Sequence, residues 1–156
     1  MSQTNWLRVR DEVRDLLKQV AGVTVVHGYP RLEKDMQITR WRSLLSDKRR
    51  INAWTILRVS TDPSFLTCNE VKVITNILLV GVLEHNDEAV TQDEFDETID
   101  LVLETFYSNY RLLGSVDIQG PAVLQLEELR QVANTPVHYA EIAIQAQQRV
   151  HFSQVK

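Results

Sequence analysis

Residues 69–85 read NEVKVITNILLVGVLEH, and the expected fold is organised around this segment. As far as Asn76 its apolar and polar residues alternate, which is typical of a strand with one solvated face. From Ile77 to Leu83 both sides are apolar, and only Gly81 interrupts them. A strand that is apolar on both faces must be covered on both. We therefore expect it at the centre of its sheet or under a partner subunit.

The composition is that of an ordinary globular protein. The chain has 156 residues, of which 44% are hydrophobic and 24% charged, so we expect one domain over residues 1–156. The net charge of −4 argues weakly against a nucleic-acid binder. The single cysteine, Cys68, excludes an internal disulfide and fits a reducing compartment. No apolar run approaches the ~18 residues that span a bilayer, and the N-terminus leads directly into a charged amphipathic pattern. We expect a soluble protein made inside a cell.

The N-terminal third predicts a helix followed by a short strand. Apolar residues recur at three- and four-residue spacing over residues 5–21, with Thr4 or Asn5 as N-cap and Gly22 as the stop signal. Residues 23–29 favour a strand. Residues 30–50 keep no clean period, and we expect a loop there with a short helix near 39–45.

A hairpin is predicted around the central segment. Residues 51–60 alternate as a strand, and residues 61–68 contain the turn-forming sequence Asp62-Pro63-Ser64. We expect an extended loop over 61–68 that joins two antiparallel strands. Phe65 and Leu66 would lie at its tip, where they either contact another protein or fold back onto the core.

The C-terminal half predicts one more helix and a second hairpin. Residues 91–94 (TQDE) fit a capping box, and the helix should run over 92–109. Residues 122–132 could be helical by propensity, but the turn sequence that follows and the alternation over 137–150 favour two antiparallel strands. The expected fold is α+β, a single mixed, mostly antiparallel sheet with two main helices in the order α-β-β-β-α-β-β.

Two charged patches of opposite sign stand out. The basic patch contains Arg40, Arg42, Lys48, Arg49 and Arg50. The acidic patch, on the polar side of the second helix, contains Asp93, Asp96, Glu97, Asp100 and Glu104. Each patch can be a solvated face. Two sharper hypotheses are that the patches meet across a contact between subunits, or that the basic patch contacts DNA phosphates.

The sequence contains no recognisable catalytic chemistry. The five glycines are scattered singly, so there is no phosphate-binding loop, and there is no G-x-S-x-G nucleophile elbow. Cys68 has no basic activator nearby in the sequence. The four histidines are dispersed and lack the short spacings of a zinc site. We expect no catalytic, cofactor-binding or metal-binding residues.

Four stretches in order resemble the tail terminator, or tail completion, proteins of long-tailed bacteriophages. They are WLRVRDEVRDLLKQVAGV (6–23), VHGYPR (26–31), INAWTILR (51–58) and VHYAEIAIQAQQRV (137–150). The resemblance implies a mixed sheet flanked by helices and a structural role in the virion tail, assembled in the host cytoplasm. It implies a ring, typically sixfold, that caps the tail tube, ends its polymerisation and meets the head connector.

The expected partners follow from that resemblance. They are further copies of the chain, the tail-tube protein and the head connector protein, with DNA passing through the ring without specific contacts. A different head–tail joining or minor structural protein is the main alternative. A small enzyme or a nucleic-acid-binding regulator is a weaker one, and salt-dependent DNA binding or a pocket with perturbed titratable groups would favour it.

Overall fold

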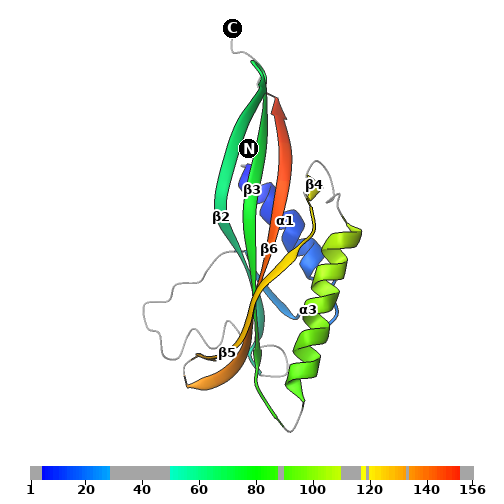
Figure 1. Cartoon of the computed structure of the whole chain (residues 1–156), viewed down its shortest axis with the longest axis vertical. Helices are drawn as coiled ribbons and strands as arrows, with labels where there is room; N and C mark the ends of the chain where they lie inside the picture. The colour runs from blue at the N-terminus through cyan, green and yellow to red at the C-terminus, as the bar shows by residue number, and fades with distance from the viewer. Residues whose placement is uncertain are drawn as a thin grey trace.

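The structure is a computed structural model that describes residues 5–28, 50–87, 90–109, 117–118, 120–132 and 134–151. These residues form two helices and six strands (Figure 1). In chain order they are α1 (Asn5–Leu17), β1 (Val25–His27), β2 (Asn52–Thr67), β3 (Glu70–Glu84), α3 (Thr91–Ser108), β4 (Asp117–Ile118), β5 (Val123–Val132) and β6 (Thr135–His151). The predicted α+β class is confirmed, with the two-residue strand β4 as an addition to the expected order.

The strands form one sheet with β3 at its centre. The order is β1-β2-β3-β6-β4, and β5 also pairs with β6. Only β1 and β2 are parallel, and the other pairs are antiparallel. Over its whole length β3 pairs with β2 on one side and with β6 on the other. The predicted central position of this strand and the mostly antiparallel sheet are therefore confirmed.

Both helices pack on the same face of the sheet, which we call the helix face. There β3 contributes Ile77, Leu79 and Leu83, each at most 3% exposed. The helices and their flanks contribute Val9, Val13, Leu17, Val20, Phe95, Ile99, Val102 and Phe106 to the same cluster. Figure 1 shows α1 behind the strands and α3 alongside them. Neither helix of the described residues is long and apolar enough to cross a membrane.

The opposite side of the sheet, which we call the outer face, is less covered. Leu78, Val80 and Val82 of β3 point to it and are half-buried. The double-sided apolar run of the sequence thus corresponds to one buried face and one half-exposed face.

Gly81 lets an indole ring lie flat on the central strand. Trp54 of β2 pairs with Gly81, and only 1% of its side chain is exposed. A Cβ atom added at Gly81 would lie 2.6 Å from Cζ2 of that indole. The gap in the apolar run is therefore a packing site for Trp54.

The predicted loop over 61–68 is wrong, because β2 continues to Thr67 and only Cys68 and Asn69 form the turn. A bulge between Arg58 and Ser60 shifts the register and breaks the alternation that would have revealed the strand. Pro63 is tolerated because the only described partner of this part of β2 is β3, so no second ladder needs its missing N–H. The ends of β2 and β3 next to the turn of Cys68 and Asn69, together with the end of β6, form an arm that extends past both helices (Figure 1).

The remaining boundaries differ modestly from expectation. Helix α1 ends at Leu17, and the chain reaches Gly22 (φ 87°) through tight turns, including a Gln19 N–H to Leu16 C=O bond of 3.1 Å. Asn5 is the first helical residue, and Thr4 lies outside the described residues, as does the short helix expected near 39–45. The hairpin of β5 and β6 is confirmed, with Asn134 in the left-handed region of its turn (φ 67°).

We predict that Gly81→Ala destabilises the fold by about 1–3 kcal/mol, the usual cost of overpacking a filled core. The added methyl group would collide with the Trp54 indole. Denaturant unfolding of Gly81→Ala in the wild-type and Trp54→Phe backgrounds measures this. The cost should be smaller beside the smaller ring, and an equal cost in both backgrounds would contradict the proposed collision.

Candidate functional site

A buried polar cluster ties the start of α3 to the sheet. His138 of β6 is 2% exposed and stacks on the Phe95 ring, with ring centroids 5.6 Å apart. Its Nε2 lies 3.0 Å from Nδ1 of His85 and 2.9 Å from the hydroxyl of Thr91. The other ring nitrogen of His85 lies 2.8 Å from Oδ1 of Asp87. Two histidines that are far apart in the sequence are therefore in direct contact.

Burial favours the neutral form of this buried imidazole. Burial lowers the pKa of His138, and the neighbouring His85 lowers it further. The negative charges of Asp96 and Asp87 raise it by a smaller amount. A neutral ring suits the contact, because one ring nitrogen must accept a hydrogen bond while the other ring donates.

The burial of this cluster favours a structural role over contact with a substrate. Thr91 and His138 are each 2% exposed, so neither presents a reactive atom to solvent. Among the described residues, no group of three His, Cys, Asp or Glu side chains could hold a metal ion. The cluster instead anchors the β3–α3 connection, and a backbone bond of 2.9 Å from His85 N–H to Pro136 C=O reinforces it.

The predicted capping box at residues 91–94 is wrong. The N-cap is Val90, in the left-handed region (φ 51°), and no side chain caps the helix there. The Thr91 hydroxyl turns inward, where it accepts a 2.8 Å hydrogen bond from the Asn86 N–H and lies against His138. Glu94 pairs with Arg50 instead of returning to the helix start. Both side chains of the sequence signature are thus engaged by partners distant in the sequence.

The one described member of the basic patch is engaged within its own chain. Arg50 donates to both carboxylate oxygens of Glu94, with a distance of 3.1 Å from Nη1 to Oε2. Arg40, Arg42, Lys48 and Arg49 lie outside the described residues. At Arg50 the basic patch therefore meets α3 inside one subunit. A contact of the other four with a neighbouring subunit stays a prediction.

The acidic patch is exposed, and β5 extends it. Asp93, Asp96, Glu97, Asp100 and Glu104 all lie on the solvated side of α3. The amide of Gln92 donates to Asp96 (2.7 Å) and to Glu127 of β5 (2.9 Å). The adjacent Asp96 raises the pKa of Glu127, and burial adds to the rise. Glu127 belongs to this surface, and no local sequence pattern predicts its place there because the β5–α3 contact is nonlocal.

The arm ends in two exposed apolar side chains. Phe65 is 83% exposed and Leu66 is 45% exposed, beside the turn at Cys68. They do not fold back onto the core, so of the two readings of these residues the structure favours a contact surface. Their position is a strand end, not the loop tip that the sequence suggested.

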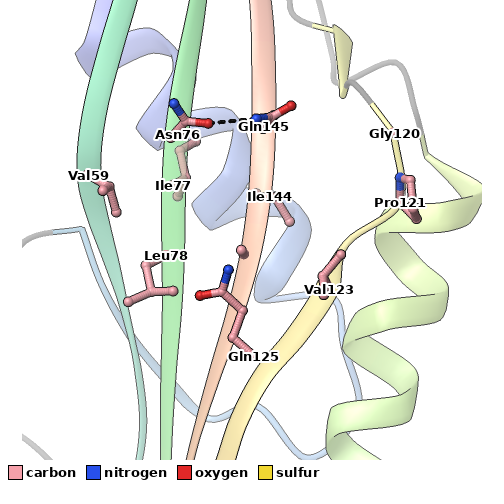
Figure 2. A pocket seen from close by; sticks show the side chains of 11 residues that line it. Val59, Asn76, Ile77, Leu78, Gly120, Pro121, Val123, Gln125, Ile144 and Gln145 are labelled. Carbon is pink, nitrogen blue, oxygen red and sulfur yellow. Dashed lines mark hydrogen bonds between the residues drawn. The ribbon is translucent and has the colours of Figure 1, made fainter.

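A groove of about 550 Å³ opens on the outer face between β3 and β5. Figure 2 shows Val59 and Leu78 on its left side and Pro121 and Val123 on its right. Its upper rim is polar, where Gln145 donates a 2.8 Å hydrogen bond to Asn76. The groove contains no titratable side chain, so it offers apolar contact rather than acid or base chemistry.

We predict that the folded state loses stability as the pH falls below about 6.5, the ordinary value for histidine. The folded pKa of His138 is lowered, so the unfolded chain binds the proton first as the pH falls. Above the unfolded pKa the group has no effect. Below it, stability falls by up to about 1.4 kcal/mol per pH unit until the folded pKa is reached.

Urea unfolding from pH 7.5 to 5.0 measures this loss, with His138→Gln as the variant that cannot titrate. The variant should be less stable at neutral pH but should show a shallower loss towards acid. Parallel pH profiles for the two proteins would assign the effect to other groups.

A comparison of the chain with models of known protein families and with curated proteins found no match.

Proposed function

We propose that this chain is a structural protein of a long-tailed phage, in which six copies form a ring on the end of the tail tube. The ring would end tube polymerisation and present a surface to the head connector. It would be assembled in the host cytoplasm and carried in the virion tail. The observation that carries the proposal is the arm, which places Phe65 (83% exposed) and Leu66 (45% exposed) beyond the helices.

The distribution of surfaces supports this role. An exposed aromatic side chain costs solubility unless a partner covers it, and here it stands on a three-stranded arm rather than on a loose loop. The acidic patch lies on α3, apart from the arm (Figure 1). A ring subunit needs one surface for each neighbour and others for the tube and connector. A chain with several separate exposed surfaces fits that need.

The sequence resemblance gives the proposal its specificity. It implies a mixed sheet flanked by helices, and the observed fold is of that kind. Another head–tail joining protein could share this architecture, and its partner would then be the connector alone. Partner choice therefore separates the two functions.

The test is the growth of tail tubes in the presence of the chain. Purified tail-tube protein of the same phage is polymerised with and without it, and tube ends and lengths are recorded by electron microscopy. We expect a ring at one end and an earlier stop to growth. Tubes of unchanged length, with the chain bound only to connector protein, would establish the joining function instead.

We predict that Phe65→Ser with Leu66→Ser abolishes binding to tube ends while leaving the stability of the free chain within about 0.5 kcal/mol, as for exposed sites in general. The matched control is Val59→Ser, which removes an exposed apolar side chain (65% exposed) from the same strand, away from the tip. The control should still cap tubes. Normal capping by the double variant would show that the arm tip is not the tube contact.

A further inference from the structure

Strand β5 is an edge that is long, regular and exposed. It has ten residues, and its only partner among the described strands is β6. After a bulge between Leu124 and Leu126 it runs without interruption to Val132. Leu129 is 58% exposed, although its neighbour across the ladder, His138, is buried.

Such an edge presents a row of backbone donors and acceptors to any extended chain. Natural proteins usually protect long edges with proline, bulges or inward-pointing charges. Residues 126–132 contain no proline and no bulge, and Glu127, Glu128 and Arg130 are their only charged side chains. An added strand would gain backbone hydrogen bonds along the edge and specificity from the alternating side chains.

The side chains of this edge are complementary to themselves in one antiparallel register. If Leu129 of one copy faces Leu129 of another, then residue 129 + k faces residue 129 − k. Arg130 then faces Glu128, Gln131 faces Glu127, and Val132 faces Leu126. Each pair lies on one face of the sheet, because cross-strand partners share a face.

Neighbouring registers lack this match. Moving the two-fold centre to residue 128 places Glu128 opposite Glu128. Moving it to residue 130 places Arg130 opposite Arg130. Like charges directly opposite each other destabilise a strand pair, so the charges select the register centred on Leu129.

We propose that β5 pairs antiparallel with β5 of a second copy, centred on Leu129, to form a two-fold symmetric dimer of the free chain. Arg130 and Glu128 already pair within each chain, and the Arg130 guanidinium lies 3.7 Å from the Tyr139 ring centroid. The dimer sets these pairs side by side as a four-charge network across the seam. The contact covers the edge that would otherwise recruit strands without limit.

This contact is independent of the proposed ring. A two-fold contact uses the same surface on both copies and closes at two, whereas a ring needs two different surfaces. The dimer is tested on the free chain, without tube protein. A free chain that does not dimerise would leave the tube-capping proposal untouched, and a chain that does not cap tubes would leave the dimer proposal untouched.

The test is a charge exchange read by mass in solution. The wild-type chain at about 100 µM, a concentration that populates a dimer of micromolar Kd, should have twice its 18.0 kDa mass. Arg130→Glu makes the strand acidic at both positions, and Glu128→Arg makes it basic at both. Each variant alone should self-associate roughly tenfold or more weakly, because like charges then face each other.

Mixing the two variants separates the contact between chains from the pair within each chain. The intrachain pair is broken in both variants, but the acidic strand of one faces the basic strand of the other. The equimolar mixture should therefore recover a dimer containing one copy of each. Arg149→Glu, the same charge change at an exposed position on the arm, should leave the wild-type dimer intact.

Hydrogen exchange gives a second readout that needs no variant. Amides of residues 126–132 should exchange slowly at high concentration and faster on dilution. The proposal would be overturned by any of three results: a wild-type chain that stays monomeric, a mixture of the two variants that stays monomeric, or amide exchange at 126–132 that does not depend on protein concentration.

Discussion

Strand β3 pairs with both of its neighbours along its full length, and this pairing sets the length of the sheet. It aligns three strands of 15 to 17 residues, each about 50 Å or more in length. The helices have 13 and 18 residues and span only about 20 and 27 Å. The helices are therefore shorter than these strands, whose ends continue past them as the arm (Figure 1).

A second feature is that the main buried cluster lies on the helix face. Trp54, the apolar side chains of both helices and alternate residues of β3 and β6 gather on the helix face. The Gly81 backbone allows this packing to be close, since the Trp54 ring occupies the space of a side chain there. The outer face, the arm tip and the β5 edge are left as surfaces. A protein that assembles with other subunits needs exposed contact surfaces. The surfaces of this fold therefore suit the proposed role.

The fold could be predicted from the sequence wherever one periodic pattern persisted. The alternation in residues 69–85 and 137–150 predicted β3 and β6, and the three- and four-residue spacing predicted the helices. Prediction failed where residues that fit a local sequence pattern contact residues far away in the sequence. The bulge beside Val59 concealed the second half of β2, and the apparent capping residues at 91 and 94 are engaged by His138 and Arg50. The contact of His85 with His138 joins residues 53 positions apart, and no local spacing reveals it.

We propose that the arm is the surface that contacts the tail tube and that the core on the helix face supports it. Hydrogen–deuterium exchange of the chain, free and bound to tail tubes, tests this directly. We expect the amides of the arm tip, residues 61–69, to become strongly protected on binding, while α1 and the middle of β3 keep the slow exchange they already have. Equal exchange of the arm tip in the free and bound states, with new protection elsewhere, would contradict the account.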